Sequence, residues 1–252
     1  MIVIGLGTGR SGTASLAKLL NAQHDALCFH EMNPSAVRFA GTPRPILNGI
    51  DEYQRILDGG DPAMVTVDLS RRVSAEAYDS LRRMKRVKLI GDIALYYLTY
   101  VEDIARHNPN VRFICLRRDV DSTVRSWMKK TQIRRWPSAS VADRIRSVIT
   151  RQPYYESSNF WMEHDGTKWL KDPVWDKCFP KMEATSKTEA IRKYCEYYYA
   201  EAERIAPKLG ERFKFVETNQ LDDRSYQPEL LRFVGIRDAD QVFTDAHIHQ
   251  SD

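Results

Sequence analysis

Short runs of apolar residues alternate with longer, more polar stretches along much of the chain. Each run is rich in β-branched, aromatic or aliphatic side chains and is short enough for one buried strand. The runs occupy residues 1–6, 26–31, 63–69, 86–92, 111–118 and 213–218. We therefore expect five strands, or six if residues 63–69 also form one.

Between these runs, apolar residues recur at the spacing of a helix. The stretch 94–107 is an example. Its Leu95, Leu98 and Val101 share one helical face, and the sequence NPN follows it as a stop signal. The predicted helices cover residues 11–22, 74–85, 94–107, 119–131, 187–206 and 228–235.

This alternation favours an α/β fold with three α/β/α layers and a mainly parallel central sheet. Ligands of such sheets bind at the carboxyl ends of the strands. Residues 132–186 interrupt the rhythm, because they combine weak periodicity with several prolines and Trp136, Trp161, Trp169 and Trp175. We expect a lid or an acceptor-binding insertion there. The sequence has no repeat and no clear linker, so we predict a single domain over residues 1–252.

Composition limits the class of protein. The 252 residues are 42% hydrophobic, which is enough for one sizeable core. The sequence has no apolar run long enough for a membrane span and no basic leader. The four cysteines lack metal-ligand spacing, and His247 and His249 lack a third ligand. We expect a reduced, cytoplasmic protein without a membrane partner or a metal.

The positive charge is concentrated in one part of the chain. The net charge is +4, but residues 112–151 hold eleven Lys or Arg against three acids, a net +8. Such a block fits a polyanionic ligand held at one place. A solvated basic helix face and a nucleic-acid surface are the alternatives.

The sequence GLGTGRSGT, residues 5–13, directly follows the first predicted strand. A glycine-rich turn between a strand and a helix points backbone N–H groups and the helix dipole at an anion, as in P-loop nucleotide-binding folds. The lysine that a Walker A loop needs is missing, and Arg10 stands earlier in the loop. No acidic magnesium partner follows, so we expect an anion site without a metal. A tight turn without a ligand is the alternative.

The loop resembles the 5′-phosphosulfate loop, GxxRSGTxxL, of sulfotransferases that use 3′-phosphoadenosine 5′-phosphosulfate (PAPS). The segment FICLRRDVDSTVRSWMK, residues 113–129, is similar to the 3′-phosphate element of that family, and residues 215–236 to its C-terminal strand and helix. The resemblance leaves residues 33–85 and 132–186 uncovered. It implies PAPS as the donor, PAP as the product, and these cofactor-binding residues: Gly9, Arg10, Ser11, Gly12, Thr13, Ala14, Arg118 and Ser126. A plain ion pair of Arg118 with Asp119 or Asp121 is the alternative.

The resemblance also suggests catalytic residues. The tyrosylprotein and heparan sulfate branches place a glutamate after the second strand, and CFHEM puts Glu31 there. We expect Glu31 to be the general base, with His30 or Asp92 as alternatives. The family's lysine after the next core strand is absent, so we assign leaving-group stabilisation to Arg10. We expect Asp92 and Tyr96 to bind the acceptor.

The expected function is sulfuryl transfer from PAPS to a hydroxyl or amine of a small-molecule or glycan acceptor. Two alternatives remain open: a nucleotide or small-molecule kinase with an aberrant loop, and a non-catalytic nucleic-acid-binding protein that uses the basic block at 112–151. The absence of a recognition motif for nucleic acid argues against the second of these.

Overall fold

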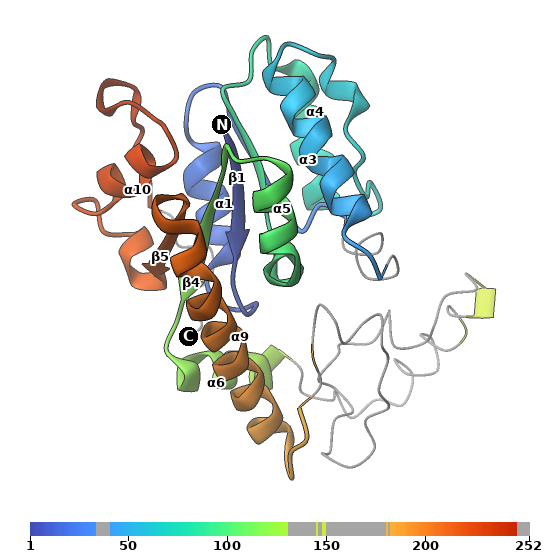
Figure 1. Ribbon diagram of the computed structural model, residues 1–252, viewed down its shortest axis with the longest axis vertical. Helices are drawn as coiled ribbons and strands as arrows, with labels where there is room; N and C mark the ends of the chain where they lie inside the picture. The colour runs from blue at the N-terminus through green and yellow to red at the C-terminus, as the bar shows by residue number, and fades with distance from the viewer. Residues whose placement is uncertain (34–40, 131–144, 146–147, 150–179, 181, 246–252) are drawn as a thin grey trace. The chain divides into compact units, whose positions relative to one another are not determined.

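A computed structural model describes residues 1–33, 41–130, 145, 148–149, 180 and 182–245 (Figure 1). The four tryptophans of the expected insertion, together with His247 and His249, lie outside these residues. Within them the chain divides into two compact units. The first holds residues 1–118, 180 and 197–245, and the second holds residues 119–130, 145, 148–149 and 182–196. Each unit is described by itself, and the single-domain expectation stays a prediction.

The first unit contains a fully parallel sheet of five strands in the order β2-β3-β1-β4-β5. The predicted α/β class with a mainly parallel sheet is therefore confirmed. The first and last strands along the chain both belong to this one sheet. The strands are β1 (Ile2–Leu6), β2 (Ala26–His30), β3 (Leu89–Ile93), β4 (Val111–Arg117) and β5 (Phe213–Glu217).

Helices cover both faces of the sheet, which gives the expected three layers. The α-helices of the first unit are α1 (Thr13–Asn21), α3 (Arg44–Leu57), α4 (Arg72–Arg83), α5 (Val101–His107), α10 (Gln227–Phe233) and the second part of α9 (Lys187–Leu209). Short 3₁₀ turns connect them: η1 (Pro62–Met64), η2 (Leu95–Tyr100), η4 (Gly210–Arg212), η5 (Thr218–Leu221) and η6 (Asp238–Asp240). None of the helices in the described ranges is both long and apolar enough to cross a membrane.

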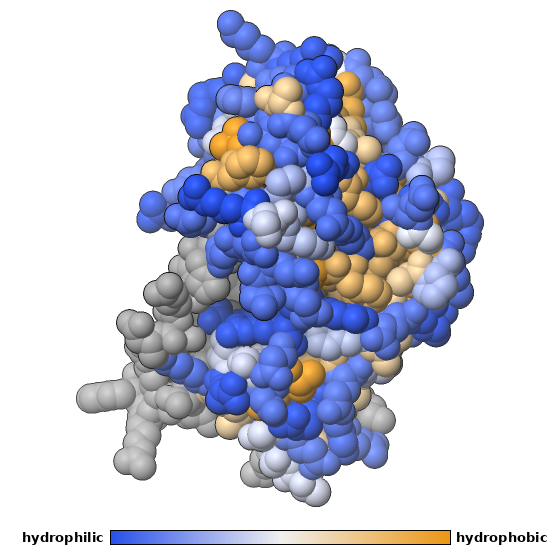
Figure 2. All heavy atoms as spheres, turned by 90° about the vertical axis from the view of Figure 1, so that its left-hand side faces the viewer, coloured by the Kyte–Doolittle hydropathy of each residue, from blue (hydrophilic) through white to orange (hydrophobic). Residues whose placement is uncertain are grey.

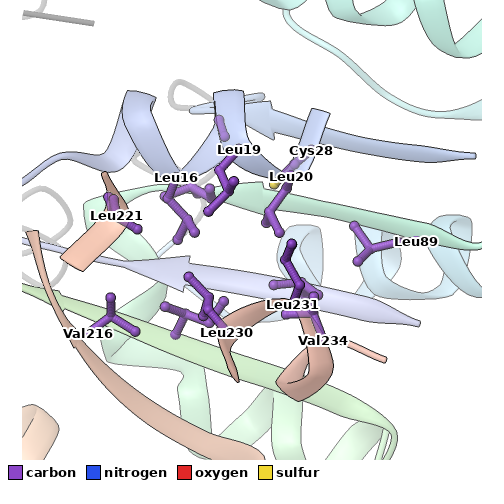
Figure 3. Close-up of a cluster of buried hydrophobic side chains, with 14 of the residues drawn as sticks. Leu16, Leu19, Leu20, Cys28, Leu89, Val216, Leu221, Leu230, Leu231 and Val234 are labelled. Atoms are coloured by element: carbon purple, nitrogen blue, oxygen red, sulfur yellow. The ribbon is translucent and has the colours of Figure 1, made fainter. Parts of the chain in front are cut away.

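The main hydrophobic core lies between α1, α10 and one face of the sheet (Figure 3). Leu16, Leu19 and Leu20 reach it from α1, and Leu230 and Leu231 reach it from α10. Alternate residues of the strands, such as Phe29, Ile90 and Phe113, are buried on the opposite face. On the face shown in Figure 2, most of the coloured residues are hydrophilic, and apolar side chains gather in a few places.

The expected strand over residues 63–69 is wrong. Pro62 opens the 3₁₀ turn η1, and the carboxylate of Asp61 caps this turn by accepting the Ala63 N–H at 2.8 Å. Met64 and Leu69 are 65% and 55% exposed, so this apolar run is not buried as a strand in a sheet. The sequence pattern identified apolar residues but did not show whether other elements of the fold bury them.

Two further elements differ from the prediction. Helix α3 was not predicted, although Ile46, Ile50 and Tyr53 recur at helical spacing and are all buried. The expected helix over residues 94–107 is divided between the 3₁₀ turn η2 and α5. In the second unit, α6 (Val120–Lys130) agrees with the predicted helix, and Arg192 of α9 pairs with Asp121 of α6.

Candidate active site

The glycine-rich loop (residues 7–12) joins β1 to α1 at the carboxyl edge of the sheet. Three of its residues have a left-handed backbone: Gly9 (φ 72°), Arg10 (φ 59°) and Gly12 (φ 88°). A Cβ at Gly12 would also come within 2.6 Å of the Thr218 methyl group. Both the backbone conformation and the close approach therefore require glycine at position 12.

The amino end of α1 is suited to an anion. Gly12 provides no side-chain cap, and the first turn of α1 contains no acidic residue. The N–H groups there keep their partial positive charge for a ligand. The Ser11 hydroxyl is buried and has no hydrogen-bond partner. These N–H and hydroxyl groups suit the sulfate and phosphate oxygens of PAPS, the sulfuryl donor that the sequence predicts.

Residues from distant parts of the chain hold the loop in place. The Tyr198 hydroxyl accepts the Gly7 N–H at 2.9 Å and donates to the Leu95 carbonyl at 3.1 Å. The Thr218 hydroxyl lies 2.8 Å from the carbonyl oxygens of both Ser11 and Arg117. Sequence reasoning missed both roles. The only signal for Thr218 was the similarity of residues 215–236 to the family's C-terminal segment.

Arg118 lies beside the loop. Its Nη1 donates to the Arg10 carbonyl at 2.7 Å, and its backbone N–H donates to the Tyr199 hydroxyl at 3.1 Å. Partial burial lowers the pKa of Arg10, and the nearby charge of Arg118 lowers it further. The fold thus holds two guanidinium groups close together, and an anion between them would relieve their repulsion.

The expected partner of Arg118, Ser126, belongs to α6 in the second unit. Its joint role with Arg118 stays a prediction. The two acids that could have neutralised Arg118 have partners within the second unit. Asp119 accepts the Ser122 N–H at 2.8 Å, and Asp121 pairs with Arg192.

Glu31 follows β2 and has a left-handed backbone, with φ of 56°. Its N–H donates to the Ile93 carbonyl at 3.1 Å, which fixes the residue against β3. Arg71 donates to the Glu31 carbonyl and forms an ion pair with its carboxylate at 2.8 Å. The carboxylate remains about 30% exposed. Arg71 precedes α4 and was not singled out by sequence reasoning.

Asp92 is fully buried in β3. Its Oδ2 accepts hydrogen bonds from the Met32 N–H at 3.0 Å, the Tyr96 hydroxyl at 3.0 Å and the Tyr97 hydroxyl at 2.8 Å, whereas its Oδ1 has no partner. Burial raises the pKa of Asp92, and the three hydrogen bonds oppose that shift. Asp92 and Tyr96 are thus buried and hydrogen-bonded to each other. Their contact with an acceptor stays a prediction.

His30 and Gly91 complete this edge of the sheet. The His30 Nε2 lies 3.0 Å from the Thr13 hydroxyl at the start of α1, so His30 faces the loop. A Cβ at Gly91 would come within 2.0 Å of the Val3 carbonyl oxygen, so no larger residue fits there. The described residues contain no cluster of three His, Cys, Asp or Glu side chains that could bind a metal. The loop, Arg118, His30, Glu31 and Asp92 all belong to the first unit.

Among solved structures, a sulfotransferase from Alicyclobacillus acidocaldarius is similar at 14% identity and a TM-score of 0.49, over 99% of this chain and 85% of that one. A sulfotransferase from Mycobacterium avium is similar at 14% identity and a TM-score of 0.45, over 93% of this chain and 64% of that one. No curated protein matches the sequence. The sequence model of the sulfotransferase family matches residues 2–171, and the chain therefore belongs to the sulfotransferase family.

Proposed function

We propose that the protein transfers a sulfuryl group from PAPS to a hydroxyl or amine of a small-molecule or glycan acceptor. The observation that carries the proposal is the contact of Arg118 with the glycine-rich loop, at 2.7 Å from the Arg10 carbonyl. PAPS has phosphate groups at two separate places, and it needs two cationic sites. The loop with Arg10 suits the 5′-phosphosulfate, and Arg118 with Ser126 suits the 3′-phosphate.

The backbone supports the choice of catalytic residues. Among the described residues other than glycine, only Arg10, Asp25 and Glu31 have a positive φ. Such conformations cost free energy, and they are enriched at functional sites. Two of these three residues are the ones that the sequence assigned to the chemistry.

Each of these residues has a defined role in the proposed reaction. Glu31 accepts the proton of the acceptor as the acceptor oxygen or nitrogen forms its bond to sulfur. The bond between sulfur and the 5′-phosphate oxygen breaks in the same displacement, and PAP leaves. Arg10 stabilises the negative charge that develops on the departing phosphate. Arg71 acts as a positioning residue, because it holds both the backbone and the carboxylate of Glu31.

The alternatives have less support. The kinase reading requires a lysine that the loop does not contain. In the nucleic-acid reading, described members of the basic block would face a ligand. Instead, Arg117 pairs with Glu203 at 2.5 Å and Arg112 donates to the Glu211 carbonyl at 3.1 Å. We keep the absence of a nucleic-acid partner and of a metal requirement as predictions. Among the described residues, Cys28 and Cys115 are free and buried, which supports the proposed reduced, cytoplasmic setting.

The Arg118→Ala variant tests the donor. We expect it to weaken the binding of PAPS and PAP together by about tenfold to a hundredfold, because it removes a charge-assisted contact worth about 1.5–3 kcal/mol. The affinity for adenosine 5′-phosphosulfate, which lacks the 3′-phosphate, should stay nearly unchanged. Isothermal titration calorimetry measures all three.

The matched control is Arg83→Ala, because Arg83 is exposed on α4 and its described contact is a 3.4 Å hydrogen bond to Ser80. This variant should bind all three nucleotides like the wild type. An equal loss for all three nucleotides in Arg118→Ala would contradict the 3′-phosphate assignment. Wild-type protein that binds ATP with magnesium but no PAP would favour the kinase reading.

A further inference from the structure

A small cavity of about 160 Å³ opens at the segment that follows β2, and Met32, the residue after Glu31, is part of its lining. Helix α3 forms one wall, and the segment after β2, Thr66 and Tyr97 form the others. All of these residues belong to the first unit. None of them has a role in the donor site described above. The residues that line the cavity are Met32, Asn33, Pro45, Ile46, Asn48, Gly49, Ile50, Glu52, Tyr53, Thr66 and Tyr97.

The cavity is connected to the backbone that holds the proposed base. Met32 directly follows Glu31, and its N–H donates to Asp92 Oδ2 at 3.0 Å. Tyr97 donates to the same oxygen at 2.8 Å. The Tyr53 hydroxyl of α3 donates to the Met32 sulfur at 3.2 Å. One buried carboxylate therefore fixes both the cavity wall and the residue after the base.

Gly49 keeps the cavity open from the side of α3. It lies inside that helix, where a glycine costs roughly 0.5–1 kcal/mol relative to alanine. Its backbone has no positive φ, and a Cβ built there would meet no atom within 4 Å. Neither backbone conformation nor crowding in the described structure requires glycine at this position. The open space beside Gly49 is part of the cavity.

The lining is mostly apolar, with Asn33, Asn48, Glu52 and Thr66 as its polar members, and it contains no positive charge among the described residues. Among the residues that line the cavity in the described structure, none is Lys, Arg or His. The Glu52 carboxylate already accepts the Thr66 N–H and hydroxyl, both at 2.8 Å, and the Asn33 amide donates to the Thr66 carbonyl. An anionic guest would be placed near Glu52 without a cation to balance it. A neutral, apolar guest fits this lining better.

We propose that this cavity binds the acceptor, and that the acceptor is a neutral phenol or cyclic alcohol whose single ring fills the space beside Gly49. This inference rests on the proposed function. An apolar cavity of about 150 Å³ holds one benzene molecule, so 160 Å³ suits one six-membered ring. The hydroxyl of the ring would then face the end of β2, where Glu31 accepts its proton. An acceptor with a carboxylate or sulfate on that ring is excluded by the charge of the lining.

Filling the cavity tests the proposal. The Gly49→Leu variant places a side chain in open space on a helix that leucine favours, so the fold should be kept. The probe is 4-methylphenol, whose binding is followed by saturation-transfer NMR and whose sulfation is followed by mass spectrometry with PAPS. We expect Gly49→Leu to show no NMR saturation of the probe and a kcat/KM at least tenfold below that of the wild type. Its PAP affinity should stay within twofold of the wild-type value.

Two comparisons sharpen the test. Gly49→Ala adds only a methyl group and should keep most of the 4-methylphenol turnover. In the wild type, 4-hydroxybenzoate carries a carboxylate on a ring of the same size and should be turned over at least tenfold less efficiently. Unchanged saturation and turnover in Gly49→Leu would overturn the cavity assignment. Equal use of 4-hydroxybenzoate would overturn the neutral class.

The two proposals can fail separately. NMR binding of 4-methylphenol needs no donor, so it reports on the cavity even if PAPS is not the donor. The wild type could bind 4-methylphenol but not PAP, while Gly49→Leu no longer binds 4-methylphenol. This result would overturn PAPS as the donor and leave the cavity assignment standing. If the wild type binds PAP but shows no NMR saturation of 4-methylphenol, the cavity assignment is overturned and PAPS remains the proposed donor.

Discussion

At the residue scale, Glu31 combines features that rarely occur together outside functional sites. Its backbone is left-handed without being glycine, and both its main chain and its carboxylate are held by Arg71. The β3 strand fixes its N–H. A side chain held this firmly and still partly exposed is suited to take a proton from a bound acceptor.

Replacing Glu31 by Gln should separate chemistry from binding. The amide has nearly the shape of the carboxylate but accepts no proton at neutral pH. We expect kcat to fall by about 10²–10⁴, the usual effect of losing a general base, while PAP affinity stays near the wild-type value. Steady-state turnover and calorimetry measure the two quantities.

The control for this variant is Glu76→Gln, because Glu76 is exposed on α4 and also pairs with an arginine, Arg72. Its kcat should be that of the wild type. A fully active Glu31→Gln protein, together with an inactive His30→Ala or Asp92→Asn protein, would move the role of the base to His30 or Asp92. The family assignment would be unaffected.

At the element scale, the start of α9 is held by a local network in the second unit. The Ser186 hydroxyl accepts the Glu189 N–H at 3.2 Å, and Glu189 Oε2 accepts the Thr185 N–H at 2.8 Å and its hydroxyl at 2.6 Å. Lys193 pairs with the same carboxylate at 2.7 Å. This arrangement resembles a capping box, but Glu189 accepts the N–H of Thr185 instead of the N–H of the N-cap residue Ser186.

The network makes a pH-dependent contribution to stability. Lys193 and Thr185 lower the pKa of Glu189 from its ordinary 4.5 to about 2. Because the folded pKa is the lower one, the stabilisation is complete above pH 4.5 and is lost as the pH falls toward 2. The Glu189→Gln variant should therefore melt at a lower temperature than the wild type at pH 7, and the difference should shrink below pH 4.5. Thermal unfolding at several pH values measures it.

Because the Glu189 side chain is about 35% exposed, solvent screening keeps this effect small. Glu196→Gln, an exposed position on the same helix, provides the control and should show no pH-dependent difference. A melting difference between wild type and Glu189→Gln that stays constant from pH 7 to pH 3 would contradict the role assigned to the ionised carboxylate.

At the scale of the whole molecule, the glycine-rich loop depends on residues far away in the sequence. Tyr198 and Thr218 follow it by almost two hundred positions or more, and both bond to its backbone. Arg118 reaches it from the end of β4. The conformation of the loop therefore depends on contacts from α9, η5 and the end of β4.

Removing the Tyr198 hydroxyl should loosen the loop. In Tyr198→Phe the buried Gly7 N–H loses its partner, which we expect to cost about 1–3 kcal/mol in the free energy of unfolding. PAP affinity should fall with it, because the loop loses an anchor. Chemical denaturation and calorimetry measure both effects.

The chain supplies its own control on the same helix. Tyr197 is about 48% exposed, so Tyr197→Phe should change neither stability nor PAP affinity. If Tyr198→Phe unfolds like the wild type, the Tyr198 hydroxyl does not anchor the loop.

The sequence by itself determined the parallel sheet and the anion loop. Both depend on local patterns: alternation of short apolar runs with helical periodicity, and glycines spaced between a strand and a helix. These signals are encoded within a few residues of the element they specify. The five strands and Gly12 were found for this reason.

Where burial depends on distant neighbours, the sequence pattern was ambiguous. Residues 63–69 are apolar enough for a strand, but Met64 and Leu69 stay exposed because no partner strand covers them. Helix α3 was not predicted, although it has the right periodicity, with Pro43 and Pro45 at its start and Gly59 just after its end. The hydroxyl groups of Tyr198 and Tyr199 accept the N–H groups of Gly7 and Arg118, and no local sequence pattern indicated these contacts.

Only the tertiary structure decided how the site residues meet. The sequence could propose Glu31 as a base, but it gave no sign that Arg71, forty residues later, would pair with it. Sequence reasoning assigned Asp92 to acceptor binding. In the fold this carboxylate is buried and accepts hydrogen bonds from Met32 and Tyr97, and a cavity lies beside Gly49. Ion pairs, buried hydrogen bonds and cavities depend on which residues lie close together in space. Local sequence patterns do not give these distances, because they are set only when the whole chain folds.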